Sequence, residues 1–142
     1  MREYTTKTEQ ETEALAEKFA RELAPGDIIA FRGGLGAGKT AFTRGLAKGL
    51  GVTDHIASPT FALVHEYCDG RVPLYHFDMY RVDSWDSLYS TDFFDYSDKN
   101  GIMAIEWSEN IENALPENAI IVTLEIVGDG IRLITMEGGG RF

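Results

Sequence analysis

One eight-residue stretch constrains this chain more than any other. It is Gly33-Gly34-Leu35-Gly36-Ala37-Gly38-Lys39-Thr40, which matches the pattern G-x-x-x-x-G-K-[ST]. Its glycines let the backbone turn back so that successive N–H groups converge on one point, where larger side chains would obstruct phosphate oxygens. The apolar run 28–31 before it, and the spacing of Phe42, Leu46 and Leu50 after it, predict a strand, a loop and a helix in that order. The helix would add its positive N-terminal end, so the motif predicts a nucleotide-phosphate site.

Four side chains have predicted roles at this site. Lys39 is expected to reach the β- and γ-phosphates as a point charge, and the Thr40 hydroxyl is expected to be a magnesium ligand. A loop of this kind also needs an acid that holds the metal from the end of a neighbouring strand, and Asp78 and Glu106 each follow a strand-like run. We favour Glu106 for the metal, because the run before it is the more apolar, as a central parallel strand should be. Asp78 would then be the carboxylate that orients water, or one that contacts the metal ligands without binding the metal itself.

The charge of the chain limits its partners. There are 13 Lys and Arg against 23 Asp and Glu, a formal net charge of −10. Proteins that grip a nucleic-acid backbone usually present a basic face, so tight direct binding of nucleic acid is not expected, and a role with RNA would need a basic partner. No apolar run is long enough to span a membrane, and the single cysteine, Cys68, favours a reducing compartment. We expect a cytoplasmic domain without membrane contact.

The remaining patterns predict one α/β domain over residues 1–142. Thr8 and Glu11 fit a capping box for a first helix, which Pro25-Gly26-Asp27 would end. The other predicted strands are two hairpins, 61–67 with 72–77 and 119–127 with 131–136, and a buried strand at 102–105.

The economical architecture for these elements is a three-layer domain like that of P-loop NTPases. Its mixed sheet would have a parallel centre and antiparallel hairpins, with helices on both faces. Residues 137–142, which include three consecutive glycines, are expected to form a flexible tail. Segment 83–98 holds five acids, five aromatic residues and no base, and it receives no assigned role.

Three further blocks add a family resemblance. Together with the glycine loop, the chain closely resembles the TsaE (YjeE) family in the content, order and spacing of Ser58-Pro59-Thr60-Phe61, His76-Phe77-Asp78-Met79-Tyr80-Arg81 and Glu106-Trp107-Ser108-Glu109. The resemblance spans nearly the whole chain. It implies a bacterial ATPase that uses ATP and Mg²⁺ and supports threonylcarbamoyladenosine formation on transfer RNA. It also implies docking on a TsaB–TsaD-like protein pair, with transfer RNA involved only indirectly.

The resemblance assigns residues as well. It implies that Thr40 and Glu106 hold magnesium, and that Thr60 lies in a switch-like loop near the γ-phosphate. Asp78 would lie in a second switch-like segment, and Thr12 near the adenine. We therefore assign the catalytic roles to Asp78, Lys39 and Thr60. The ATP-binding positions are Thr12, Gly34, Leu35, Gly36, Ala37, Gly38, Lys39, Thr40 and Phe42.

Three other functions would use the same loop. A small-molecule kinase usually needs a lid that carries arginines, but beyond Arg81 the only basic residues are Lys99, Arg132 and Arg141. A guanine-nucleotide switch commonly carries an Asn-Lys-x-Asp segment, which this sequence lacks. An assembly module that binds ATP with negligible turnover differs from an ATPase only in degree. No side chain is an obvious strong base for water, so hydrolysis by the isolated protein is expected to be slow.

Overall fold

The computed structural model describes residues 1–33, 37–53, 64–79, 82–89, 91, 93–97, 99–140 and 142. These residues form strands, α-helices and one 3₁₀ helix, η1. In chain order the elements are β1 (Arg2–Thr6), α1 (Glu9–Ala20), β2 (Ile28–Arg32), α2 (Lys39–Gly49), β3 (Val64–Tyr67), β4 (Leu74–Asp78), α3 (Trp85–Tyr89), α4 (Phe93–Ser97), β5 (Ile102–Glu106), η1 (Ser108–Ala114), β6 (Ile120–Gly128) and β7 (Ile131–Gly138).

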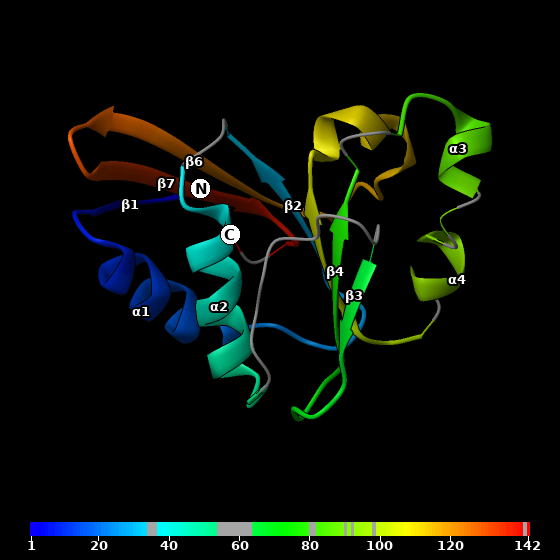
Figure 1. Cartoon of the computed structure of the whole chain (residues 1–142), viewed down its shortest axis with the longest axis horizontal. Coiled ribbons are helices and arrows are strands. Elements are labelled where there is room, and N and C mark those ends of the chain that lie inside the picture. The colour runs from blue at the N-terminus through cyan, green and yellow to red at the C-terminus, as the bar shows by residue number, and fades with distance from the viewer. Residues whose placement is uncertain are drawn as a thin grey trace.

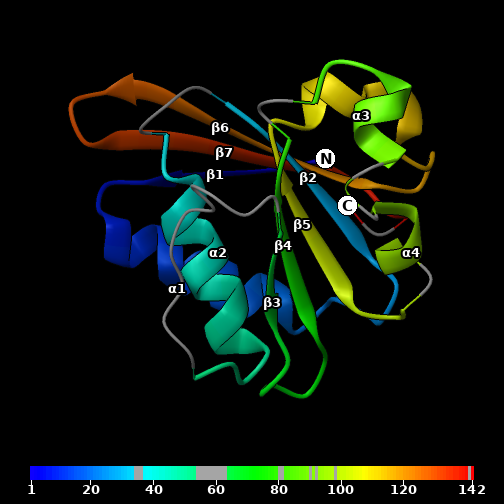
Figure 2. The same ribbon diagram turned by 45° about the vertical axis from the view of Figure 1, so that its right-hand side comes forward.

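The described strands make one mixed sheet in the order β1-β7-β6-β2-β5-β4-β3. Its centre is parallel, because β2 pairs in parallel with both β6 and β5, and β5 pairs in parallel with β4. Antiparallel pairs flank this centre, with β3 on β4 at one side and β7 and β1 beyond β6 at the other. Figure 2 shows β2, β5, β4 and β3 following one another across the sheet. The predicted parallel centre with antiparallel hairpins is confirmed.

Helices cover both faces of the sheet, as the patterning predicted. Figure 1 shows α1 and α2 together on one side and α3 and α4 on the other. Each face has its own buried cluster, with Phe42 and Leu46 of α2 in the first and Leu88 and Phe93 in the second. Side chains alternate along a strand, so Leu74 faces α1 and α2 while Phe77 faces α3 and α4.

The first helix begins as expected but ends earlier. The Thr8 side chain accepts a hydrogen bond from the Glu11 N–H at 3.0 Å, which confirms the N-cap. The helix stops at Ala20 rather than at Pro25, and the chain turns through residues 21–27. The Asp27 carboxylate closes this turn by accepting from the Ala24 N–H at 2.7 Å.

Two segments differ from the sequence predictions. Strand β1 was not expected, and it forms because it pairs along its length with β7, for instance Tyr4 with Ile134. The expected flexible tail over 137–142 is corrected. Strand β7 continues to Gly138, and the Phe142 ring packs on Phe19 with 4.9 Å between ring centroids.

Segment 83–98 has a packing role in the second layer. It holds two five-residue helices, α3 and α4. The Phe93 and Tyr96 rings pack edge-on against Phe77 of β4, at 5.7 and 5.3 Å between centroids. Half of the Trp85 side chain stays exposed (51%), as does most of Tyr89 (63%), so this layer also presents aromatic rings to solvent.

Candidate nucleotide-binding site

The phosphate-loop motif lies between β2 and α2, in the strand–loop–helix order that its sequence predicted. Gly34, Leu35 and Gly36 lie outside the described residues. Ala37 is buried, and Gly38 precedes α2 with φ of 101°, a left-handed conformation that glycine adopts without steric cost. Helix α2 starts at Lys39, so the positive end of its dipole lies at the end of the loop.

Lys39 is held between the loop and the block that follows β5. Its Nζ donates to the Gly33 carbonyl oxygen at 3.0 Å and lies 4.9 Å from the centroid of the Trp107 ring. The residue is only 7% exposed, and no carboxylate of the described residues pairs with it. A buried ammonium is costly unless a negative group neutralises it, so this arrangement favours an anionic ligand.

Asp78 and Glu106 lie side by side at the carboxyl ends of β4 and β5. The parallel register pairs them directly, so both side chains point to the face that α2 covers. Glu106 is 8% exposed, and its Oε2 accepts from Nε2 of His76 at 2.6 Å. Asp78 is half-buried. The structure thus brings both predicted carboxylates to the sheet edge that holds the loop.

These oxygen donors fit a magnesium ion shared with a nucleotide. Mg²⁺ prefers hard oxygen ligands, and proteins usually hold it through one or two carboxylates together with substrate phosphates. Thr40 lies half-buried in the first turn of α2. Glu106 lies at the end of β5, which is adjacent to β2, the strand that leads into the loop. Among the described residues no group of three or more His, Cys, Asp or Glu side chains could hold a metal by itself. The donor set therefore matches a metal completed by phosphates.

Helix η1 ties the strand ends together behind this site. The Ser108 hydroxyl donates to the Phe31 carbonyl at 2.8 Å, and the Asn110 amide donates to the Met79 carbonyl at 2.8 Å. Arg32 and Glu112 form an ion pair between the end of β2 and η1. Trp107 leads into this helix with φ of 59°, an outlier for a bulky residue. Sequence reasoning did not single out Asn110, because one amide in a polar segment gives no signal.

Thr12 lines a small cavity next to the start of α2. The cavity has a volume of about 140 Å³, and its lining residues come from the start of α1, the start of α2 and the β6–β7 hairpin: Lys7, Thr8, Glu9, Thr12, Gly38, Ala41, Gly130 and Arg132. Thr12 is fixed there by a 2.8 Å hydrogen bond between its hydroxyl and that of Thr6. The resemblance implied that Thr12 lies near the adenine, and this stays a prediction. Sequence spacing did not single out the hairpin residues, because it does not place a distant hairpin beside the loop.

Two of the predicted positions need separate comment. Phe42 is fully buried, its ring packs on Phe19 and Phe31, and its N–H bonds to the Gly38 carbonyl. It belongs to the inward face of α2, one turn after the loop. Its assignment as an ATP-binding position stays a prediction. Thr60 and the switch-like loop around it lie outside the described residues.

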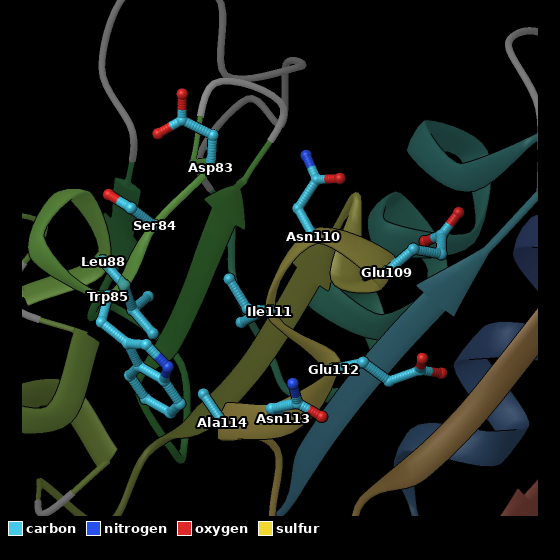
Figure 3. Close-up of a pocket in the computed structure, with 10 residues that line it drawn as sticks. All are labelled: Asp83, Ser84, Trp85, Leu88, Glu109, Asn110, Ile111, Glu112, Asn113 and Ala114. Carbon is cyan, nitrogen blue, oxygen red and sulfur yellow. The ribbon is translucent and has the colours of Figure 1, made fainter.

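A second cavity lies on the opposite face of the sheet and has different chemistry. It has a volume of about 300 Å³ and lies between α3 and η1. Figure 3 shows Asp83 and Trp85 on one side of it and Glu109 and Glu112 on the other. None of its lining residues is basic, so it does not suit a polyphosphate.

None of the described helices is long and apolar enough to cross a membrane.

Comparison with known proteins gives one consistent result. Residues 6–133 match the family model for "Threonylcarbamoyl adenosine biosynthesis protein TsaE". A TsaE protein of Bacillus subtilis is 39% identical over 138 residues, covering 97% of this chain and 86% of the relative. The Treponema pallidum protein is 38% identical over 136 residues, covering 92% and 96%. The crystal structure of Bacillus subtilis YdiB superposes with a TM-score of 0.83 at 37% identity, covering 99% of this chain and 88% of that one.

Proposed function

Because the chain belongs to the TsaE family, which acts in threonylcarbamoyladenosine biosynthesis on transfer RNA, we propose that it binds and slowly hydrolyses ATP with Mg²⁺ and acts by docking on a TsaB–TsaD-like protein pair. The observation that carries the proposal is the Lys39 ammonium. It is 7% exposed at the first residue of α2, and a carbonyl and an aromatic face are its only partners in the described structure. A triphosphate would supply the negative charge that this ammonium lacks.

The positions of the described residues support these proposed roles. The loop N–H groups and the start of α2 would bind the phosphate oxygens, with Lys39 at the β- and γ-phosphates. Thr40 and Glu106 would hold the magnesium ion, which would neutralise charge on those phosphates. The purine would occupy the cavity beside Thr12, which opens next to Gly38.

Asp78 is the residue proposed to orient the attacking water. It lies beside Glu106 in the β4–β5 register and is half-buried. His76 is not available as a base, because it is fully buried and its Nε2 is bonded to Glu106. With no stronger base placed at the loop among the described residues, catalysis depends on positioning, and slow turnover follows. If the rate of hydrolysis were negligible, the same site would make the protein an ATP-binding assembly module.

Calorimetry on variants of α2 tests the proposal. Lys39→Ala should weaken ATP binding by about 1.5–3 kcal/mol, roughly 10- to 150-fold, because a charge-assisted contact is lost. Thr40→Ala should lose only the part of the affinity that magnesium adds. Lys48→Ala is the matched control, since Lys48 lies on the same helix with its side chain 63% exposed. Equal ATP affinity in the Lys39 variant and the wild type would refute the phosphate-loop assignment.

A further inference from the structure

We propose that His76 is a positioning residue for the magnesium ligand Glu106. Its hydrogen bond fixes one carboxylate oxygen, Oε2, and so presents the other, Oε1, to the metal. The inference rests on the magnesium–ATP site proposed above and adds a residue that does not itself touch nucleotide or metal.

The sheet register explains how the two side chains meet. His76 on β4 pairs with Ala104 on β5, two residues before Glu106, and both His76 and Glu106 point to the α2 face. The small Ala104 side chain leaves the imidazole room to lean along the strands toward the next residue on that face. Diagonal neighbours of this kind lie within reach of long and aromatic side chains. The resulting Nε2–Oε2 distance of 2.6 Å is short for an N–H···O bond, and a carboxylate acceptor favours such shortening.

Burial makes this bond the dominant feature of the histidine. His76 is fully buried, and its Nδ1 has no hydrogen-bond partner among the described residues. An ionised carboxylate can only accept, so the bond requires a proton on Nε2. An apolar side chain would fill this place on the core face without leaving a ring nitrogen unpaired. The polar ring is therefore accounted for by what it does to Glu106.

A fixed carboxylate matters for the metal proposed here. Mg²⁺ requires nearly ideal octahedral geometry, so a ligand that rotates freely binds it less well. Partners that orient a ligating side chain typically account for a 10- to 100-fold difference in metal affinity. Glu106 is 8% exposed, so solvent is poorly placed to supply that orientation in place of the imidazole.

The test compares two substitutions of His76. His76→Leu removes the donor, whereas His76→Gln places an amide N–H donor near the position of Nε2. Calorimetry measures the Mg²⁺ concentration that gives half of the full increase in ATP affinity. For His76→Leu we expect this Mg²⁺ concentration to be about 10- to 100-fold higher than for the wild type. For His76→Gln we expect it to return most of the way to the wild-type value. ATP affinity without Mg²⁺ should be unchanged in both variants. His65→Gln is the control for a local disturbance, because His65 is the cross-strand neighbour of His76 but has Tyr67 rather than a carboxylate as its side-chain partner.

Several outcomes would overturn the inference. One is a folded His76→Leu protein with the wild-type Mg²⁺ requirement, and another is an equal defect in the Leu and Gln variants, which would indicate packing alone. If the wild type shows no Mg²⁺ effect on ATP binding, the proposed site itself fails, and this appears before any variant is compared. Should His76→Leu not fold, ¹⁵N NMR of the wild-type imidazole decides: the His76 Nε2–H resonance should shift in Glu106→Gln and on adding Mg²⁺ with ATP, and an unresponsive resonance contradicts the proposal.

Discussion

At the scale of single residues, the two carboxylates at the strand ends differ in their surroundings. Glu106 is nearly buried and bonded to His76, whereas Asp78 is half-buried beside it. Glu106→Gln should therefore raise the Mg²⁺ requirement for ATP binding, because the charge proposed to face the metal is lost. Asp78→Asn should leave ATP and Mg²⁺ binding intact and lower the rate of phosphate release. Magnesium titrations and a phosphate-release assay on both variants check this, and the reverse pattern would mean that the two roles are exchanged.

Sequence reasoning could place single residues where a local motif holds them. The loop pattern placed Lys39 and Thr40 at the start of a helix, and an apolar run placed Glu106 at the end of a strand, as the structure has them. Their roles toward nucleotide and metal stay predictions. The bond between His76 and Glu106 did not follow, because it depends on the register between β4 and β5. The helical periodicity after the loop predicted that Phe42 turns into the core, as it does, whereas its assignment to ATP binding stays a prediction.

At the scale of elements, α1 and α2 approach each other closely through a glycine. A Cβ at Gly45 would lie 2.2 Å from the Glu13 carbonyl oxygen and 2.6 Å from the Ala16 Cβ. In an open helix, replacing glycine by alanine stabilises by up to about 1 kcal/mol. Here Gly45→Ala should instead lower the free energy of unfolding by about 1–3 kcal/mol, because the helices must separate.

Urea unfolding measures the effect of Gly45→Ala. Gly128→Ala is the control, because the nearest atom to its added methyl is the end of the Ile131 side chain at 3.2 Å, which can move. A Gly45 variant that is as stable as the wild type, or more so, would show that the helix pair yields at little cost.

The elements themselves were predictable where hydrophobic periodicity is strong. The buried strands and the capped first helix follow from local patterns. Strand β1 did not, because four of its five side chains face solvent at least in part and only its pairing with β7 makes it a strand. Helices α3 and α4 are five residues each, too short for a helical period to show.

At the scale of the whole molecule, the net charge of −10 disfavours a nucleic-acid backbone as a direct partner. Free protein should bind transfer RNA weakly or not at all at physiological salt, because an acidic surface releases no counterions from RNA. It should bind a TsaB–TsaD-like pair more tightly with ATP than with ADP. A nucleotide shifts an equilibrium between two conformations only if its affinity for them differs, so this coupling requires ATP and ADP to differ in their effect on partner affinity. Thr60→Ala should reduce that difference more than it reduces ATP affinity.

Native gels and calorimetry with ATP and with ADP check these expectations, with Lys39→Ala as the variant that lacks the proposed nucleotide contact. Tight binding of transfer RNA by the free protein, together with equal partner affinity for the two nucleotides, would contradict the coupling.

The strand order also bears on how the chain is made. Strand β2, which leads into the phosphate loop, lies between β5 and β6, and both follow it in the chain. Strand β1 likewise has β7 as its partner in the described sheet, the first strand with the last. Such pairings between distant segments form late, because loop closure must precede them. During synthesis on the ribosome, the loop therefore leaves the exit tunnel long before the strands that frame it. A half-made chain has the motif without its scaffold, and nucleotide capture should begin only once β6 has emerged.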